Sequence, residues 1–304
     1  DYSKIGNIHE VVNRSYCIVY RNAIEEKIDH GIIKCGGFKV AVDVMHGATS
    51  ELVPSLLNYL GVENVILNAY YDEQKLTNIK TLAKKSESNI SSIVKSLHYD
   101  MGLLIYPNAQ KVVIVTEEGE VLDKVKALYT VLSLLDLDAG EEKKKVFLPT
   151  WAPDIKYFAN LKIKRGKYSN FTAAQLMKYD LVATVDGNYS FTDFGYTRDA
   201  IYSSLKIMEM LSCHQVKLSV LAKGIDDFYY NTFKIDYVQS LKGKMMRKFL
   251  ESAKGKKSSS LDGVKIWEDE NDWILMIPDQ YSEHLNIYVQ AIDDKAGRAI
   301  YEKY

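Results

Sequence analysis

The 304-residue sequence has little cysteine and proline, no long hydrophobic run and no excess of either charge. Its three cysteines are scattered and form no Cys-x-x-Cys pair, which argues against a disulfide framework and predicts reduced thiols in a cytoplasmic protein. No apolar run approaches the length of a membrane span, and the net charge of −1 comes from interspersed charges of both signs. These absences predict that the chain binds neither nucleic acid nor a membrane.

The first residues of the sequence do not resemble a targeting signal. There is no signal peptide and no initiator methionine, and the first residues, DYSKIGNI, are typical of the middle of a polypeptide. We therefore expect a fragment of a longer protein whose N-terminal domains are missing. The length is sufficient for two or three domains that each bury a core.

The first part of the chain has the hydrophobic pattern of a βαβ unit with parallel strands. The pattern predicts a helix over residues 11–29, a strand over 38–45, a helix over 49–60 and a strand over 64–67. His46 follows the first of these strands and is a candidate catalytic base. Because it has no evident partner in the sequence, we favour a loop-capping or surface histidine.

The next stretch predicts an irregular segment, a short helix and a hairpin. Residues 71–87 are polar, and a helix marked by Ile90 and Val94 follows, with Ser88 as its N-cap. Two apolar, β-branched runs at 101–106 and 111–116 flank turn residues and predict two buried strands. The whole stretch between Asp100 and Glu117 contains no carboxylate.

The second half of the chain continues to alternate strands and helices before its composition changes near residue 225. We expect helices at 123–135, 152–159 and 200–211, strands at 146–148 and 181–186, and a basic amphipathic helix at 241–253. The basic run KGKKSSS at 254–260 could bind phosphate, but it is more typical of a flexible surface loop.

The hairpin resembles the metal loop of the α-D-phosphohexomutases, the phosphomannomutases and phosphoglucomutases. Asp100, Gly102, Ala109 and Gly119 match the frame of that motif. The resemblance places the three metal-binding aspartates of the family at Tyr106, Asn108 and Gln110, and its arginine at Lys111. Mg²⁺ in phosphoryl transfer normally requires one or two carboxylates. We therefore predict no metal and no cofactor here, although the family uses Mg²⁺.

Two further loops resemble the same family in their frame but not in their functional side chains. In the sugar loop Gly187 and Phe191 match, whereas the glutamate, serine and histidine of the family are replaced by Thr184, Asp186 and Asn188. The segment from Asp262 resembles the fourth mutase domain. Its phosphate loop has Ile277, Asp279, Tyr281 and Asn286 in place of an arginine, a serine, a threonine and a second arginine. Asp279 and Glu283 would repel a phosphate, so we predict no phosphate site.

The resemblance covers nearly the whole chain and implies the second, third and fourth mutase domains. The fold class is then α/β, with two α/β/α domains at 1–121 and 122–224 and a small α+β domain of the TBP-like type at 225–304. The lead-in KIGNIHEVVNRSY and the segment LNAYYDE are also similar to the mutase-like C-terminal region of fused mannose-1-phosphate guanylyltransferases.

Three functions stay open at this point. The first is a non-catalytic, mutase-derived module for regulation or assembly of a sugar-nucleotide pyrophosphorylase, which is a nucleotidyltransferase. The second is a phosphomannomutase or phosphoglucomutase whose site is completed by a missing first domain. The third is a binding module for a sugar phosphate or nucleotide sugar. A homo-oligomer is compatible with all three.

Overall fold

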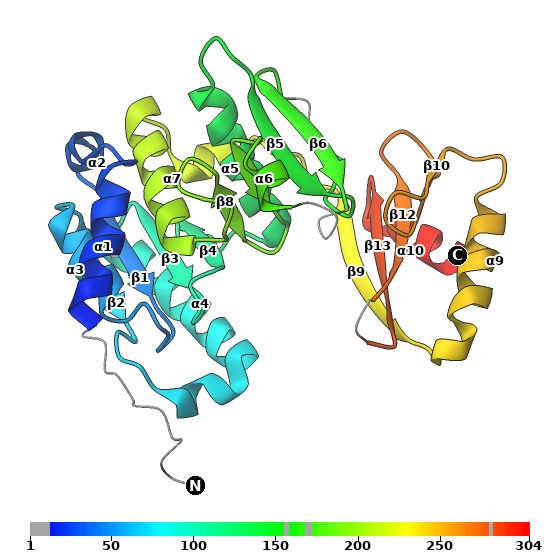
Figure 1. Cartoon of the computed structure of the whole chain (residues 1–304), viewed down its shortest axis with the longest axis horizontal. Helices are drawn as coiled ribbons and strands as arrows, with labels where there is room; N and C mark the ends of the chain where they lie inside the picture. Colours follow the sequence, from blue (N-terminus) through cyan, green and yellow to red (C-terminus); the bar gives the residue numbers. More distant parts are fainter. Residues whose placement is uncertain (1–12, 155–157, 168–171, 280–281) are drawn as a thin grey trace, which may run out of the picture. The chain divides into compact units, whose positions relative to one another are not determined.

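The computed structural model describes residues 13–154, 158–167, 172–279 and 282–304, and the chain divides into two compact units. The first unit comprises Asp1–Glu120 and Asp199–Gln215, and the second comprises Val121–Arg198 and Val216–Tyr304. The described residues form three β-sheets, one in the first unit and two in the second (Figure 1). The predicted fold class, two α/β domains followed by a small α+β domain, is confirmed. The predicted division into domains at 1–121, 122–224 and 225–304 stays a prediction.

The first unit contains a four-stranded sheet in the order β2-β1-β3-β4. Strand β1 is parallel to β2 and β3, and β3 pairs with β4 as an antiparallel hairpin, which confirms both the βαβ unit and the predicted hairpin. β3 is buried along its whole length, as its continuous apolar run predicts. The strands are β1 (Lys39–Asp43), β2 (Glu63–Leu67), β3 (Met101–Ile105) and β4 (Val112–Thr116).

Helices pack on this sheet from both near and distant parts of the sequence. The 3₁₀ and α-helices of the unit are α1 (Asn13–Glu25), α2 (His30–Gly36), α3 (Leu52–Tyr59), η2 (Glu73–Asn78), α4 (Ile79–Leu97) and α7 (Ala200–His214). α4 packs against β1 and β3, α3 packs against β2, and α7 packs against α2 and β3. Asp199 caps α7 by accepting hydrogen bonds from the backbone N–H groups of Ile201 and Tyr202.

Helix α4 is much longer than the sequence pattern predicts. It begins at Ile79 with Asn78 as its N-cap, so the prediction of an irregular segment up to residue 87 and of Ser88 as the cap is wrong. The buried side of its first half consists of small residues, Ala83 and Ser86, rather than large apolar ones. Hydrophobic periodicity cannot detect such a face, which explains the error.

The second unit begins with a sheet in the order β6-β5-β7-β8. β5 is parallel to β6 and β7, and β7 and β8 form an antiparallel hairpin. The helix predicted at residues 152–159 is wrong for its described part, because 152–154 and 158–159 are not helical. The elements are α5 (Lys124–Asp138), β5 (Lys144–Pro149), β6 (Leu161–Gly166), α6 (Ala173–Leu176), β7 (Leu181–Ala183), β8 (Tyr189–Phe191) and α8 (Leu218–Lys223).

The remaining sheet of the second unit is antiparallel throughout, in the order β10-β11-β12-β13-β9. One of its faces packs with Phe249 and Ile300 from two helices into a hydrophobic core. Part of the run predicted as a flexible loop forms strand β10, so that prediction is wrong there. The elements are β9 (Tyr229–Asp236), η4 (Gln239–Leu241), α9 (Lys242–Ser252), β10 (Ser258–Ser259), β11 (Val264–Trp267), β12 (Trp273–Pro278), β13 (His284–Ala291) and α10 (Asp294–Lys303).

The helices were also compared with the length and apolar character that a bilayer requires. Within the part of the chain that the structure describes, no helix is both long enough and apolar enough to cross a membrane.

Candidate functional site

The loop between β3 and β4, residues 106–111, lies where the sequence resembles a metal loop. It closes on itself: the N–H of Tyr106 donates to the carbonyl of Lys111 over 2.9 Å, and the N–H of Gln110 donates to the side chain of Asn108 over 3.2 Å. The Lys111 ammonium lies 4.2 Å from the centre of the Tyr106 ring, a cation–π contact. The structure thus brings the four predicted residues together on one turn.

The rest of the first unit fixes this loop through backbone hydrogen bonds. The carbonyl of Pro107 accepts from the N–H of Ala48 over 3.0 Å, and the carbonyl of Ala109 accepts from the N–H of Ala200 over 2.8 Å. A Cβ atom on Gly47 would lie 2.3 Å from the Cα of Pro107, so a glycine is needed for this approach. These two hydrogen bonds involve main-chain atoms only, so they do not depend on which side chains stand at 106, 108, 110 and 111.

The side chains of this loop do not fit a magnesium ion. They supply a phenol, two amides and an ammonium, whereas Mg²⁺ prefers carboxylate and other oxygen ligands. The positive charge of Lys111 would also repel a divalent cation. Across the described ranges, no group of three or more His, Cys, Asp or Glu side chains is placed to hold a metal. We derive no chemical step through a metal at this site.

The loop between β7 and β8, residues 184–188, is the predicted sugar loop. Its ends are joined by a hydrogen bond from the N–H of Thr184 to the carbonyl of Asn188 over 3.0 Å, and the Asn188 amide donates to the Thr184 hydroxyl over 3.1 Å. Gly187 has a φ of 81°, a left-handed conformation that favours glycine. Thr184 is buried, and the Asp186 carboxylate forms an exposed ion pair of 2.6 Å with Lys124.

The predicted phosphate loop joins β12 to β13. The register pairs Ile277 with Asn286, so the two positions that carry arginines in the resembling family lie side by side on one face of the sheet. Here they offer one amide and no positive charge. Asp279 accepts a hydrogen bond from the N–H of Ser282 over 2.9 Å. Tyr281 lies outside the described residues.

Carboxylates near Tyr288 determine the electrostatics around the predicted loops of the second unit. Burial, and then the nearby carboxylates of Asp186, Asp262 and Asp279, raise the pKa of Tyr288 to about 12. Its ring stacks on that of Trp151, with 5.9 Å between centroids. The same carboxylates that disfavour a phenolate would disfavour a phosphate dianion.

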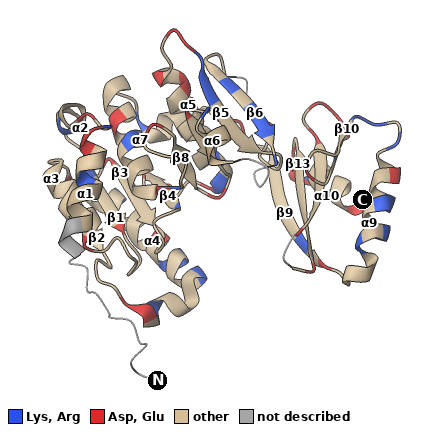
Figure 2. Ribbon diagram, in the orientation of Figure 1, with Lys and Arg blue, Asp and Glu red and all other residues tan. Residues whose placement is uncertain are grey.

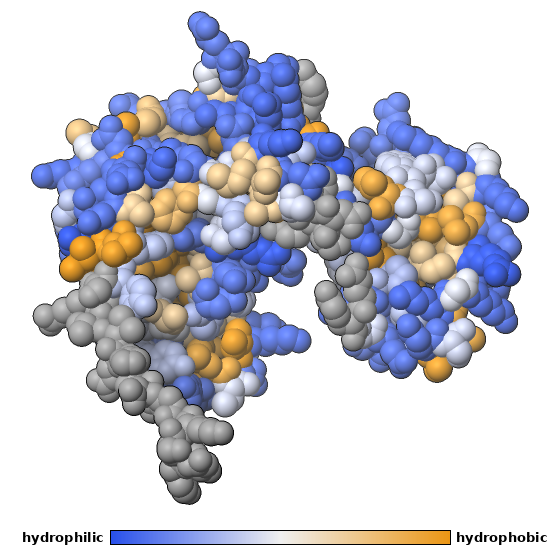
Figure 3. Space-filling view, in the orientation of Figure 1, coloured by the Kyte–Doolittle hydropathy of each residue, from blue (hydrophilic) through white to orange (hydrophobic). Residues whose placement is uncertain are grey.

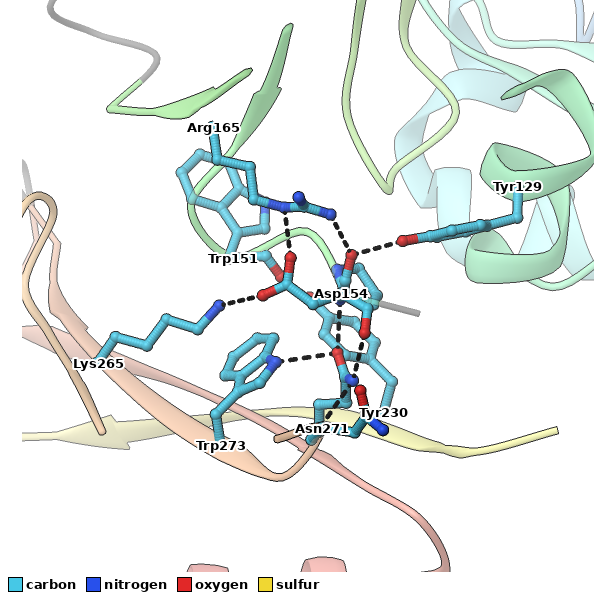
Figure 4. A network of polar contacts seen from close by, with 10 residues as sticks. Tyr129, Trp151, Asp154, Arg165, Tyr230, Lys265, Asn271 and Trp273 are labelled. Atoms are coloured by element: carbon cyan, nitrogen blue, oxygen red, sulfur yellow. Dashed lines mark hydrogen bonds and ion pairs between the residues drawn. The ribbon is translucent and has the colours of Figure 1, made fainter. Parts of the chain in front are cut away.

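A partly buried polar network in the second unit was not predicted from the sequence (Figure 4). The Asp154 carboxylate forms an ion pair of 2.8 Å with the Arg165 Nε and accepts a hydrogen bond from Lys265 over 3.0 Å, so one carboxylate faces two cations. Gln290 accepts from the N–H of Asp154 over 2.7 Å and from the Trp273 indole over 3.0 Å. The network ties the loop after β5 to strands β11, β12 and β13.

Lys265 is the least exposed charged residue of this network. Its side chain is 7% exposed, and its ammonium lies 3.6 Å from the centre of the Trp273 ring. Burial lowers the pKa of Lys265 to about 8, although the Asp154 carboxylate opposes this shift. The contacts of Lys265 and Asp154 join residues more than a hundred positions apart, so no local sequence signal could have revealed them.

The first unit also contains a hollow of about 950 Å³ between α1, the loop before α3 and the segment after β2. Tyrosines line it, with Tyr16 and Tyr20 from α1 and Tyr70 and Tyr71 from the opposite side. Its only indication in the sequence was the pair of tyrosines in LNAYYDE. None of the predicted site residues lines it.

The structure corrects the interpretation of His46. This residue is 3% exposed, and its ring contacts that of Tyr70 edge-on, with 4.4 Å between centroids. The sequence predicts a loop-capping or a surface histidine, and this burial shows that the surface alternative is wrong. In the described part of the chain its Nδ1 atom has no hydrogen-bond partner, so a proton-transfer role has no support.

Residues 19–119 match the sequence model of the phosphoglucomutase/phosphomannomutase α/β/α domain II. A phosphoglucomutase/phosphomannomutase of Thermococcus kodakarensis is 25% identical over 99% of this chain and 67% of its own length. A phosphoglucosamine mutase of Methanocaldococcus jannaschii is 22% identical over 88% of this chain and 62% of its own length. The chain thus spans between 44% and 67% of the length of the curated relatives that it matches.

Solved structures show the same similarity. A phosphoglucomutase/phosphomannomutase family protein of Burkholderia thailandensis superposes with a TM-score of 0.72 at 17% identity, covering 94% of this chain and 62% of that one. An N-acetylglucosamine-phosphate mutase in its substrate complex superposes with a TM-score of 0.64 at 9% identity, covering 95% and 65%. The chain therefore has the fold of the α-D-phosphohexomutase superfamily, with the second domain of that superfamily at residues 19–119.

Proposed function

We propose that this chain is a non-catalytic module built on the phosphohexomutase fold. The observation that carries the proposal is the β3–β4 loop, which has no carboxylate between Asp100 and Glu117 and holds the Lys111 ammonium over Tyr106. Catalysis of phosphoryl transfer is almost entirely positioning and charge stabilisation, in which the metal has a central part. A loop that repels the metal removes that contribution.

The second unit supports the proposal independently. Ile277 and Asn286 lie opposite each other where a pair of arginines would bind phosphate bidentately. Loss of one transition-state hydrogen-bond donor costs roughly 3–4 kcal/mol of barrier, so loss of the metal ligands and of both arginines leaves no useful rate.

The test is an assay for interconversion of hexose 1-phosphates and 6-phosphates by the longest natural polypeptide that contains this chain. We expect no turnover of mannose 1-phosphate or glucose 1-phosphate, and no Mg²⁺ binding by titration calorimetry. The Thermococcus kodakarensis relative is the positive control. Turnover by the unmodified protein would overturn the proposal.

A loop variant separates the metal defect from the others. Tyr106→Asp, Asn108→Asp and Gln110→Asp together restore three carboxylates, and we expect this variant to bind Mg²⁺. It should remain inactive, because Ile277 and Thr184 still replace an arginine and a glutamate. If this variant were active and the unmodified protein were not, the loss of the metal site alone would explain the missing activity.

The second candidate is a phosphohexomutase whose site is completed by a domain outside this chain. The relatives favour it, because the proteins from Thermococcus kodakarensis and Methanocaldococcus jannaschii are both named as mutases. A phosphorylatable serine loop in the polypeptide before Asp1, together with turnover in the assay above, would establish this function.

A finer version of the first proposal makes the chain the regulatory or assembly region of a sugar-nucleotide pyrophosphorylase. It is supported only by the similarity of the segments KIGNIHEVVNRSY and LNAYYDE to the mutase-like region of fused mannose-1-phosphate guanylyltransferases. Sequencing the coding region before Asp1 tests it directly, because it requires a nucleotidyltransferase domain there. Calorimetry with mannose 1-phosphate and GDP-mannose tests whether the module also binds a sugar phosphate or a nucleotide sugar.

A further inference from the structure

Helix α9 and the turn after it concentrate positive charge in a chain that is nearly neutral as a whole. Residues 242–257 contain seven basic side chains and one acidic side chain, Glu251. Figure 2 shows Lys and Arg along α9. The basic residues are Lys242, Lys244, Arg247, Lys248, Lys254, Lys256 and Lys257.

The helix turns these charges toward solvent. Its inner side carries Met245, Met246 and Phe249, which pack into the hydrophobic core of the C-terminal sheet. Lys244, Arg247 and Lys248 are exposed and stand at positions i, i+3 and i+4, so they are neighbours on the outer side. The charged stripe is therefore fixed in place by the packing of the opposite face.

One carboxylate of α9, that of Glu251, stands at i+4 from Arg247 and i+3 from Lys248, so it offsets only part of the positive charge of this stripe. Lys256 pairs with Glu268 over 2.7 Å, but the structure records no ion pair for Lys244, Arg247 or Lys248 among the described residues. Adjacent like charges on a helix repel one another. An anionic partner would relieve that repulsion, so the stripe has the electrostatics of a binding surface.

Exposed aliphatic side chains flank the stripe. Val238 is 62% exposed, and Leu241 and Leu250 are each 46% exposed. Figure 3 shows isolated hydrophobic side chains within the hydrophilic surface of this region. A nucleic acid offers phosphates but no apolar phase for these side chains, whereas a lipid bilayer offers both. Lysine also outnumbers arginine here, which is not typical of bidentate phosphate readout.

We propose that this surface, consisting of Lys244, Arg247 and Lys248 with Val238, Leu241 and Leu250, binds the surface of an anionic lipid bilayer. The contact is peripheral and reversible, with the lysines and the arginine near the headgroups and the aliphatic side chains at the boundary with the acyl chains. Each basic residue near such a surface strengthens binding roughly fivefold, and salt weakens the attraction. The basic amphipathic helix that the sequence predicts at 241–253 carries this local excess, although the net charge of the whole chain is near zero.

The test is flotation of the 304-residue protein with vesicles of phosphatidylcholine alone or mixed with phosphatidylserine. We expect binding only to the mixed vesicles, weakening as salt is raised. The triple variant Lys244→Glu, Arg247→Glu, Lys248→Glu should bind at least about a hundredfold more weakly, from roughly fivefold for each charge. Leu241→Ser with Leu250→Ser should also weaken binding while leaving its salt dependence in place.

A matched control changes charge elsewhere in the same unit. Lys162→Glu with Lys164→Glu alters two exposed lysines of β6 and should leave flotation unchanged. Circular dichroism melting verifies that every variant is folded. Equal binding to both kinds of vesicle, or an unchanged triple variant, would overturn the proposal. Tight binding to duplex DNA that is insensitive to the leucine changes would assign the surface to a polyanion instead.

Discussion

The sheet of the first unit and the first sheet of the second unit have the same strand order and the same directions. In each, the first strand lies in the middle, parallel to the next two strands, and a hairpin adds an antiparallel fourth strand. Each hairpin turn carries one of the predicted site loops, residues 106–111 and residues 184–188. The 106–111 loop and the loop after β5 in the second sheet are held in place by different means.

The 106–111 loop is held by backbone hydrogen bonds to the rest of its unit, whereas the loop after β5 is held by side-chain contacts. Backbone hydrogen bonds from Ala48 and Ala200 hold the 106–111 loop, and they do not involve the side chains at its ligand positions. The loop after β5 is instead fixed by the Asp154 carboxylate, with Arg165 and Lys265 on either side. A backbone-anchored loop tolerates the replacement of its functional side chains, whereas a side-chain anchor does not tolerate the loss of one member.

The largest predicted effect is the removal of the side-chain anchor. Asp154→Ala leaves Lys265 buried without its carboxylate, and we expect it to lower the free energy of unfolding by about 3 kcal/mol. Denaturant titration monitored by circular dichroism measures the change. As a control, Asp186→Ala removes an exposed ion pair with Lys124 and should cost at most about 1 kcal/mol. If both variants lost the same free energy of unfolding, the Asp154 contacts would be no more important for stability than an exposed ion pair, which would contradict their role as an anchor.

The second prediction compares the hairpin turns directly. Gly187 and Ala109 both have positive φ, at 81° and 57°. Gly187→Ala should destabilise the protein by about 1–2 kcal/mol, because a Cβ atom is disfavoured in this conformation. Ala109→Gly removes the same strain but increases the freedom of the unfolded chain, so its effect should lie between zero and about 1 kcal/mol of stabilisation. Thermal melting of both variants measures the two changes in stability. If Ala109→Gly destabilised the protein, the two hairpin turns would not share the same backbone strain.

The third and smallest effect concerns pH and the network. The pKa of Lys265 is about 8 in the folded protein and about 10.5 in the unfolded chain, so the unfolded state binds more protons between these values. Stability contributed by this group therefore rises with pH in that window, by about 1.4 kcal/mol per pH unit. Lys265→Met should lack this rise. The melting temperatures of the unmodified protein and of Lys265→Met at pH 8 and pH 9 measure this difference. An equal change with pH in both proteins would exclude a lowered pKa of Lys265.

Much of the fold was predictable because it depends on local patterns. The apolar runs of β3 and β4 and the turn between them predicted a buried hairpin, and the structure confirms it. The start of α4 was not predictable, because its buried residues Ala83 and Ser86 are small. The helix expected near residue 152 is absent from the described residues there, because contacts with Gln290 and Lys265 decide the conformation of this segment.

The candidate site was predictable in its positions but not in its surroundings. Alignment with a family placed Ile277 and Asn286, and only the strand register shows that they face each other. The Asp154 network joins three separate stretches of sequence, so periodicity and spacing gave no sign of it. Long-range polar contacts are the part of a structure that local rules cannot supply.

Helix α7 has a consequence for the order in which the chain folds. It follows β8 in the sequence, but it belongs to the first unit, where Asp199 accepts from the Tyr20 hydroxyl and Ser212 donates to the carbonyl of Ile32. A ribosome must therefore synthesise residues 121–198 before the first unit receives its last helix. The strands β5 to β8 leave the ribosome while the hydrophobic core of the first unit still lacks α7. Residues 121–198 then form a long loop whose ends must come together before α7 can pack on the first unit. Assembly of this molecule on the ribosome cannot proceed strictly from its N-terminus to its C-terminus.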